Sequence, residues 1–261
     1  MKTLCTLLAL LLGGATLLPA QTANEIVDAQ DVRHRLANEV TVMDLRLTDR
    51  SGAEQTRTLR RSDKTGEDRL RKSLVVFTEP PDIRGTALLT WEHEGTDNDQ
   101  WLYLPSRGRL LRVAQGRRDA YFMGTDFTYE DMDPDDLDDY TYELAGETAI
   151  DGATCYIIDA RPVEAQRKRS AYSRRRLIIE KERLLTWRVE FYGHGDTLLK
   201  TQVNGRPKQI NDTAWRMDTA HVVNHKDTHE TKVDIVSRST ESTLDDSTFS
   251  ERHILTGRYI E

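Results

Sequence analysis

Cysteine is scarce in this chain, since Cys5 and Cys155 are the only two among 261 residues. Cys5 lies at the front of an apolar opening segment, whereas a lipidated cysteine would lie at its end, so the sequence does not predict a lipoprotein. Once that segment is removed, Cys155 is alone and no internal disulfide can form. A disulfide-stabilised fold is therefore excluded. Cys155 lies in the β-like run 154–158 and is predicted to be a small buried apolar side chain.

An excess of basic charge is also missing. The chain has 37 Lys and Arg residues against 44 Asp and Glu residues, and its formal net charge is −7. Affinity for nucleic-acid backbones comes from the release of counterions to a basic protein face. This composition therefore excludes a general nucleic-acid binder.

The signatures of familiar enzymes are absent as well. The sequence contains no G-x-S-x-G elbow, no Walker phosphate loop, no G-x-G-x-x-G after a strand, no H-E-x-x-H and no C-x-x-C. No catalytic residue can be nominated. We therefore predict that the protein is not an enzyme and that it uses no cofactor.

Three histidines with regular spacing require a separate test. His221, His225 and His229 are four residues apart, and on a helix they could share a zinc ion. Their surroundings instead predict two strands with a turn between them. Residues four apart on a strand are separated by about 13 Å, which is too far for one metal ion. The sequence therefore favours no metal site.

Long hydrophobic runs are limited to residues 4–18, which follow the positive charge of Lys2 and precede Leu18-Pro19-Ala20. This run is shorter than the roughly 20 apolar residues that span a bilayer, and it ends in small residues. We expect residues 1–20 to be a secretory signal peptide and residues 21–261 to form a single exported domain. An uncleaved N-terminal anchor is the alternative.

The mature chain is expected to open with an amphipathic helix from Thr22 to about Glu39. Thr22 followed three residues later by Glu25 fits a capping box. The apolar residues that recur at roughly helical spacing are Ile26, Val27, Val32 and Leu36. We predict that this apolar face closes over the rest of the domain.

After this helix the apolar period changes to two, which is typical of strands. Strand-length segments bounded by turn residues or charges are predicted at 43–47, 55–61, 70–78, 86–93, 100–104, 109–114, 141–146, 154–160, 174–180, 184–192, 198–203, 213–223 and 231–238. In the clearest of them, Leu185, Trp187, Val189 and Phe191 alternate with polar residues. The sequence therefore predicts a mainly β protein, an antiparallel sheet curled around its apolar face.

Two charged segments interrupt this pattern. Residues 130–139 begin like a calcium-binding loop, but Asp136 replaces the required glycine and Tyr142 replaces the required glutamate. A solvated loop or a short helix is expected there instead. The basic residues at 167–169 and 174–176 are predicted to form an exposed hairpin tip. Contact of this patch with anionic lipid head groups or an acidic partner is the alternative.

Three motifs resemble the LolA-like outer-membrane lipoprotein-sorting family, in its uncharacterised branch. They are PPDIRGTALL at 80–89, DQWLYLP at 99–105 and FMGTDFTYED at 122–131. The resemblance extends over nearly the whole mature chain. It implies a half-open antiparallel β-barrel with helices as a lid, a periplasmic location, and a concave apolar face that receives acyl chains.

The function implied is that of a periplasmic carrier or chaperone for lipidated or hydrophobic cargo on its way to the outer membrane. Its partners would be lipid or lipoprotein acyl chains, an inner-membrane lipid exporter or an outer-membrane acceptor, with peripheral membrane contact. The alternative is an accessory or sensor protein of a lipid exporter or envelope-stress system, which binds a protein partner and carries no cargo.

Candidate residues follow from this reading. The candidates for the apolar cavity are Leu45, Leu47, Val76, Leu89, Trp91, Trp101, Leu111, Trp187, Val189, Phe191, Trp215 and Met217. The candidates for the lid are Ile26, Val27, Val32 and Leu36. The motif residues Asp82, Arg84, Asp126 and Tyr129 are expected to hold turns at the rim of the barrel.

Overall fold

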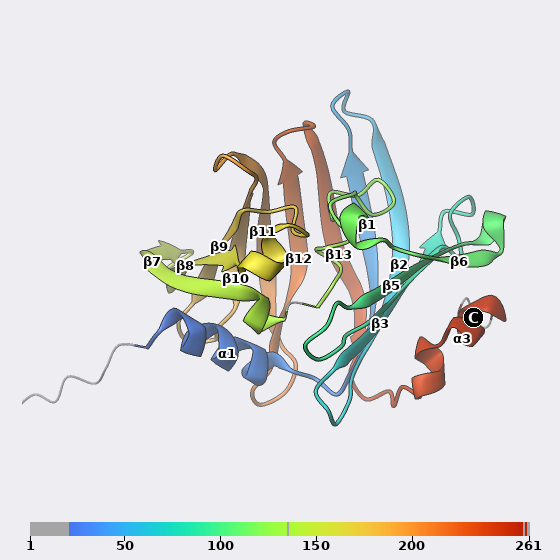
Figure 1. The fold of residues 1–261 in the computed structure, drawn as a ribbon, viewed down its shortest axis with the longest axis horizontal. Coiled ribbons are helices and arrows are strands. Elements are labelled where there is room, and N and C mark those ends of the chain that lie inside the picture. Colours follow the sequence, from blue (N-terminus) through green and yellow to red (C-terminus); the bar gives the residue numbers. More distant parts are fainter. Residues whose placement is uncertain (1–20, 135, 258, 260–261) are drawn as a thin grey trace, which may run out of the picture.

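The computed structural model describes residues 21–134, 136–257 and 259, and the predicted signal peptide at 1–20 lies outside these described residues. The described chain forms one antiparallel sheet of thirteen strands together with a few short helices. Figure 1 shows the sheet curving around a concave side without closing. This confirms the predicted mainly β, half-open barrel. No helix among the described residues is long and apolar enough to cross a membrane.

The thirteen predicted strand segments all correspond to observed strands. The strands are β1 (Asn38–Thr48), β2 (Glu54–Thr65), β3 (Arg71–Glu79), β4 (Ala87–Trp91), β5 (Asp99–Leu104), β6 (Arg109–Arg112), β7 (Tyr140–Ile150), β8 (Ala153–Pro162), β9 (Arg174–Glu180), β10 (Thr186–Tyr192), β11 (Leu198–Gln209), β12 (Trp215–Asn224) and β13 (His229–Ser239). The α-helices are α1 (Ala23–His34), α2 (Glu164–Arg167) and α3 (Glu251–Leu255). Single 3₁₀ turns are η1 (Pro105–Arg107), η2 (Gln115–Arg117), η3 (Leu137–Asp139) and η4 (Asp246–Phe249).

The order of the strands determines where the barrel opens. Strands that follow one another in sequence lie side by side, with the exception of β6 and β7, and β1 pairs with β13 at the centre of the sheet. The two free edges are therefore β6 and β7, which are consecutive in the sequence. The segment that joins them, residues 113–134, is called the β6–β7 connection below. It runs across the concave side of the sheet (Figure 1).

Helix α1 begins as predicted but ends earlier. The Thr22 side chain accepts from the Glu25 N–H at 3.3 Å, and the Glu25 carboxylate accepts from the Thr22 N–H at 2.8 Å, which completes the capping box. The helix stops at His34 and β1 starts at Asn38, so the predicted end near Glu39 is wrong. The reason is that β1 pairs along its length with both β2 and β13, which outweighs a helical pattern in a short segment.

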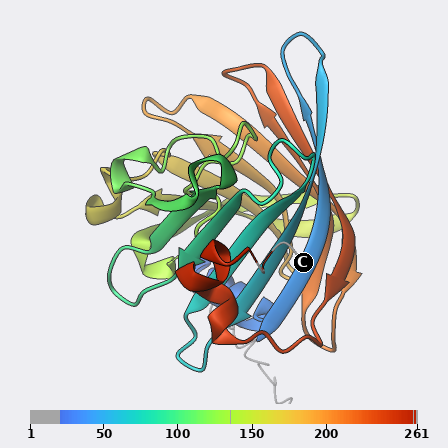
Figure 2. The ribbon, with the colours of Figure 1, turned by 90° about the vertical axis from the view of Figure 1, so that its right-hand side faces the viewer.

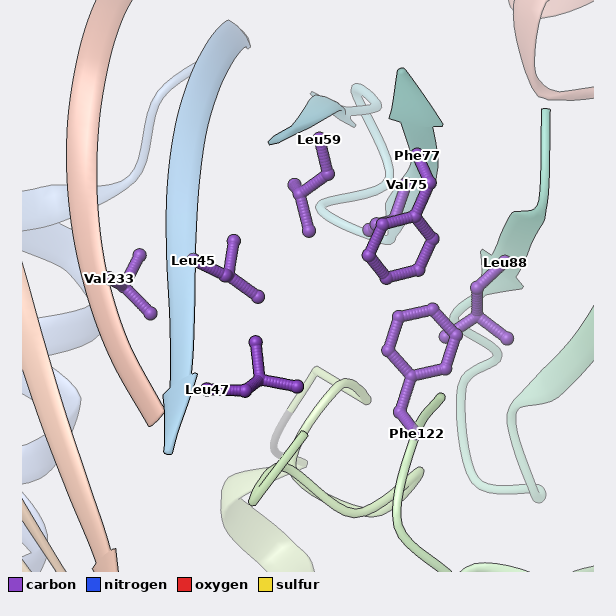
Figure 3. Packing of buried hydrophobic residues seen from close by; sticks show 8 residues of the cluster. All are labelled: Leu45, Leu47, Leu59, Val75, Phe77, Leu88, Phe122 and Val233. Carbon is purple, nitrogen blue, oxygen red and sulfur yellow. The ribbon is translucent and has the colours of Figure 1, made fainter. Parts of the chain in front are cut away.

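The main apolar cluster lies on the concave face. Figure 3 shows Leu45 and Leu47 of β1 facing Phe77 of β3 and Phe122 of the β6–β7 connection. The rings of Phe77 and Phe122 are stacked, with centroids 5.5 Å apart. The other buried members are Leu59, Val75, Leu88 and Val233. A segment that connects two edges of the sheet thus supplies part of the core.

A second cluster covers the convex face of β3 to β5. Figure 2 shows the C-terminal segment with η4 and α3 lying across these strands, where Phe249, Ile254 and Tyr259 are buried. The Trp91 indole donates to the Phe249 carbonyl at 2.7 Å. This cluster contains four of the predicted cavity residues, namely Val76, Leu89, Trp91 and Trp101. Their expected inner-face placement is wrong, because these strands are apolar on both faces and periodicity cannot choose between them.

A β-bulge changes the expected face of β10. The pairing with β9 shifts between Thr186 and Arg188, so Trp187 is the additional residue. Trp187 packs with Cys155 and Ile178, and its indole donates to Glu180 at 2.9 Å. It therefore does not share a face with Val189 and Phe191, contrary to the prediction. Cys155 is fully buried in this cluster, as predicted, and burial raises the pKa of its thiol.

The packing of the C-terminal segment yields a test. Phe249→Ala should lower the free energy of unfolding by about 3 kcal/mol, because it removes a fully buried ring from the convex cluster. Leu255→Ala is the control, since Leu255 lies in the neighbouring helix α3 and is exposed, and it should change stability by less than about 0.5 kcal/mol. Urea unfolding followed by tryptophan fluorescence measures both. Equal losses would contradict this packing.

Candidate functional site

A cavity of about 750 Å³ lies between the concave face of the sheet, helix α1 and the β6–β7 connection. This volume is within the range of roughly 300 to 1,000 Å³ that is usual for small-molecule sites. Strands from both halves of the sheet contribute to its wall. The cavity is therefore a partly open one, bounded by the curved sheet and by two segments that cross its concave side.

Much of the wall is apolar. Leu45, Leu59 and Val75 line it from β1 to β3, and Phe122 and Phe127 line it from the β6–β7 connection. The other apolar residues in the wall are Val27, Leu36, Met43, Met132, Pro134, Leu137, Ala160, Leu177, Leu185, Val189, Phe191, Trp215, Met217, Ala220, Val233 and Ile235. Such a surface suits a hydrocarbon group.

The predicted cavity residues divide into two groups. Those that line the cavity are Leu45, Val189, Phe191, Trp215 and Met217. Leu47 is buried in the concave-face cluster and does not reach the cavity. Leu111 lies opposite Leu102 on the edge strand β6, half-buried and away from the cavity wall. Val76, Leu89, Trp91, Trp101 and Trp187 lie in the two other clusters described above.

The predicted lid residues also differ in position. Ile26 and Val27 are buried against Ile158 and Ile179 of the sheet, so α1 packs on β8 and β9. Val27 also lines the cavity, together with Leu36, which lies beyond the end of the helix. Val32 is 63% exposed and covers nothing. The helix therefore closes the cavity with one face and with the segment that follows it.

The C-terminal half of α1 is fixed by polar contacts to backbone. Gln30 donates to the Leu184 carbonyl at 2.6 Å and to the Thr186 hydroxyl at 3.0 Å. Arg33 donates to the Glu182 carbonyl at 2.6 Å and to the Thr213 carbonyl at 3.2 Å. These four hydrogen bonds hold the helix end to the segment 182–186 and to Thr213.

His34 completes this attachment and has a defined protonation state. Its Nδ1 accepts from the Trp215 N–H at 3.1 Å, so Nε2 carries the proton and donates to the carbonyls of Arg183 at 2.9 Å and Leu184 at 3.1 Å. Burial, and to a smaller extent the charges of Arg216 and Arg33, lower the pKa of His34, although the two carbonyls act in the opposite direction. His34 is therefore neutral near pH 7.

The second cover, the β6–β7 connection, is held by Asp126. This carboxylate is buried and accepts from His229 Nδ1 at 2.7 Å, Thr231 Oγ1 at 2.7 Å and Asn224 Nδ2 at 3.2 Å. The Asp126 N–H donates to Thr231 Oγ1 at 3.0 Å. The motif residue therefore ties the connection to β12 and β13.

Lys200 joins the same network from β11. Its ammonium donates to the Asp126 carbonyl at 2.9 Å and forms an ion pair with Asp131. Tyr172 donates to Asp131 at 2.9 Å, and burial, reinforced by the charge of Asp131, raises the pKa of Tyr172 well above its usual value. The middle and the end of the 122–131 motif are thus fixed by one buried cation.

The acidic segment that begins at Glu130 is largely buried in its first half. Glu130 accepts from the Ser170 hydroxyl at 2.5 Å and the Ala171 N–H at 2.6 Å, and burial raises its pKa. Asp133 pairs with Arg118 at 2.7 Å. The expected solvated loop is therefore wrong here, because buried cations and donors face these carboxylates. The expected short helix is present as η3.

The basic segment is likewise paired. Arg174 is buried between Asp159 at 3.2 Å and Asp196 at 2.8 Å, and its guanidinium lies 3.6 Å from the Tyr192 ring centroid. Arg176 also pairs with Asp159, at 2.7 Å. Residues 174–176 belong to β9 and are not an exposed hairpin tip. The charges of Arg174 and Arg176 are therefore used in ion pairs within the protein.

The three other rim candidates, Asp82, Arg84 and Tyr129, do not line the cavity. Asp82 and Arg84 are exposed in the turn between β3 and β4. Tyr129 packs edge-on against Phe122, with ring centroids 5.7 Å apart. The four rim candidates therefore differ in burial: Asp82 and Arg84 are exposed, Tyr129 is half-buried and Asp126 is buried.

The three spaced histidines have separate partners. His221 contacts Glu230 at 2.8 Å, His225 contacts Thr201 at 2.9 Å, and His229 contacts Asp126. Within the part of the chain that the structure describes, no group of three or more His, Cys, Asp or Glu side chains is arranged to hold a metal ion.

One end of the cavity is polar, and this feature was missed by the sequence prediction. Here Arg61, Glu39, Arg216 and Arg238 line the wall beside His34. The sequence of β2 could have revealed this polar end. Leu59, Arg61 and Asp63 are two residues apart and therefore lie on one face of the strand, so Arg61 and Asp63 face the cavity if Leu59 does.

The sequence of this chain matches a family model over most of its length. A family model described as "Uncharacterized protein" matches residues 69–256. No curated protein is significantly similar in sequence.

Three solved structures share the fold. A domain from Vibrio parahaemolyticus, described as an outer membrane lipoprotein-sorting protein domain, is 26% identical, with a TM-score of 0.84 over 89% of this chain and 98% of its own. A DUF1329 family protein from Desulfovibrio piger is 28% identical, with a TM-score of 0.83 over 89% and 97%. A LolA superfamily protein from Nitrosomonas europaea is 21% identical, with a TM-score of 0.70 over 90% and 100%, and it shows the fold alone.

The neutral imidazole of His34 predicts that the free energy of unfolding depends on pH. A folded pKa below the unfolded value of about 6.5 means that the unfolded chain binds the proton more readily. The stability that His34 contributes is therefore present above pH 6.5 and is lost as the pH falls from 6.5 toward the lowered folded pKa. His34→Gln should reduce the difference between unfolding free energies at pH 7.5 and pH 5.5. The exposed His194→Gln should leave it unchanged, and an equal effect of both would contradict this role.

The role of Asp126 is tested by Asp126→Ala. The substitution should lower the free energy of unfolding by about 3 kcal/mol, because it leaves buried donors from β12 and β13 without their acceptor. It should also expose the β6–β7 connection to limited proteolysis. The exposed Asp119→Ala, in the same connection, is the control and should have neither effect. A stable, protease-resistant Asp126→Ala protein would contradict the role.

Proposed function

We propose, from the premise that the chain belongs to the uncharacterized family whose model it matches and has the LolA-like fold, that it is a periplasmic carrier or chaperone for lipidated or hydrophobic cargo. Its partners would be acyl chains and the membrane machinery that supplies or accepts them. Export would follow from the apolar segment at residues 4–18, removed as a signal peptide.

The observation that carries this proposal is the cavity itself. Its apolar wall is formed by the inner face of a curved sheet and by two covers, α1 and the β6–β7 connection. An acyl chain needs no catalytic group to be retained there. Each buried methylene contributes about 0.8 kcal/mol, so a chain of roughly 16 carbons offers on the order of 10 kcal/mol before the losses of association.

The relatives support this reading only in part. The Vibrio parahaemolyticus domain is described as a lipoprotein-sorting domain, and its similarity extends over most of both chains. Fold alone does not determine function, so the inference to cargo binding depends on the apolar cavity in this chain. The same cavity gives no support to hydrolysis, for which no nucleophile with an activating base can be nominated within the described lining.

The test is an organic extract of protein purified from its native host, analysed by mass spectrometry. We expect acylated molecules in amounts approaching one per protein, together with uptake of a fluorescent fatty acid by the emptied protein. An empty extract combined with no uptake would overturn the carrier. If a stable protein partner were then captured by pull-down, the accessory or sensor role would take its place.

A cavity-filling variant makes the test specific. Ala220 lines the cavity from β12, so Ala220→Phe should occupy part of the space and weaken uptake by about tenfold or more. Ala149 is exposed on β7, and Ala149→Phe is the matched control with the same added ring. Uptake should be unchanged in the control. Equal uptake by Ala220→Phe and the control would show that the probe binds elsewhere.

A further inference from the structure

The concave face of the central strands is layered along the barrel axis. In one layer, Leu45 of β1 lies opposite Val233 of β13. In the next, Met43 lies between Leu59 of β2 and Ile235 of β13. All of these residues line the cavity. The cavity-lining residues of these two layers are thus apolar, since Arg57, which lies opposite Leu45 on β2, does not line the cavity and donates to the Met123 carbonyl.

The following layers are charged. Thr41 of β1 lies between Arg61 of β2 and Arg238 of β13, so two guanidinium groups adjoin the Met43 layer. One layer further, Glu39 lies opposite Asp63. All five residues line the cavity. Along the wall formed by β1, β2 and β13, arginine therefore comes before carboxylate when one moves away from the apolar layers.

Arg61 is oriented in a way that leaves its outer nitrogens available. Its Nε donates to both Asp63 oxygens, at 2.9 and 2.8 Å, and the charge of Asp63 raises the pKa of the guanidinium. Within the described residues, its two terminal nitrogens have no hydrogen-bond partner. The side chain is one-third exposed. Asp63 therefore fixes the guanidinium from one side.

Glu39 lies between two further arginines. It accepts from Arg216 Nε at 3.0 Å, and it forms an ion pair with Arg238 at 2.8 Å without a hydrogen bond to Arg238 Nε; Arg238 also pairs with Asp218. Arg216 in addition donates to the His34 carbonyl at 2.8 Å, at the end of α1. The carboxylates thus hold a preorganised cluster of guanidinium groups at one end of the cavity.

We propose that the cavity takes an amphiphile with one anionic head, a carboxylate or a phosphate, held at Arg61 and Arg216 while its apolar tail lies along the Met43 and Leu45 layers. This inference rests on the proposed carrier function and adds the class of cargo.

The charge of the head follows from the order of the layers. Guanidinium groups recognise carboxylates and phosphates with paired, charge-assisted hydrogen bonds, which a neutral hydroxyl head cannot provide. A cationic head would meet the arginines first and would have to pass them to reach Glu39. The chain as a whole has a net charge of −7, so this cluster is a local feature and does not reflect general basicity.

The experiment compares ligands with one tail and different heads. Hexadecanoate, hexadecyl phosphate, hexadecanol and hexadecylamine compete for the delipidated protein against a neutral fluorescent apolar probe. We expect one or both anionic ligands to bind about tenfold or more tightly than the alcohol, and the amine to bind more weakly than the anions. The two anions distinguish a carboxylate from a phosphate source. Inorganic phosphate alone should not displace the probe.

Two variants and a control locate the head group. Arg61→Gln should remove most of the preference for the anions and leave the affinity for hexadecanol unchanged. Arg61→Lys should keep part of the preference, since it retains the charge and loses the paired geometry. Arg46→Gln is the control, because Arg46 is exposed on the adjacent strand β1 and its loss changes the net charge equally. Each variant is used only after its unfolding curve matches that of the wild type.

The outcomes separate this inference from the carrier function. If no ligand displaces the probe, the proposed function itself fails. If all heads bind equally, or the amine binds best, the carrier remains and the anionic head is excluded. An anion preference that survives unchanged in Arg61→Gln would also overturn the assignment. Displacement by inorganic phosphate would indicate a small-anion site in place of an amphiphile site.

Discussion

The pairing of β1 with β13 is the constraint on which the rest of this structure depends. It brings the first and last strands together in the middle of the sheet, so that all other strands follow in sequence order on either side. The two free edges are then β6 and β7, and the residues between them have to cross the opening. The cavity and one of its covers are therefore consequences of a single antiparallel contact.

The strands and the general shape could be predicted because they depend on short-range pattern. Alternation in β1, or in β10 after its bulge, is visible within a few residues, and the Thr22 capping box is local as well. The choice of face is not local. Leu74 and Val76 face the C-terminal segment while Val75 and Phe77 face the cavity side, and all four are buried. Nothing in β3 itself distinguishes these two faces.

The polar parts of the site were harder to predict for a related reason. Asp126, Lys200 and Thr231 meet across separations of up to 105 residues, so their contact depends on the complete topology. The same applies to Arg61 and Arg238, which share a layer only because β1 lies between β2 and β13. Charged residues in such positions have the composition of a solvated surface until the strand order is known.

The two covers of the cavity, the β6–β7 connection and α1, are held by different kinds of contact. The β6–β7 connection is fixed by the buried Lys200 and Asp131 pair and by Asp126, and breaking a buried pair costs about 3 to 5 kcal/mol. The end of α1 is held mainly by hydrogen bonds to carbonyls from Gln30, Arg33 and His34. Each contributes a net of about 1 kcal/mol, since water can replace it. The contacts of residues 30–36 can therefore be replaced by water one at a time, and Gln30, His34 and Leu36 line the same cavity as the arginine layer.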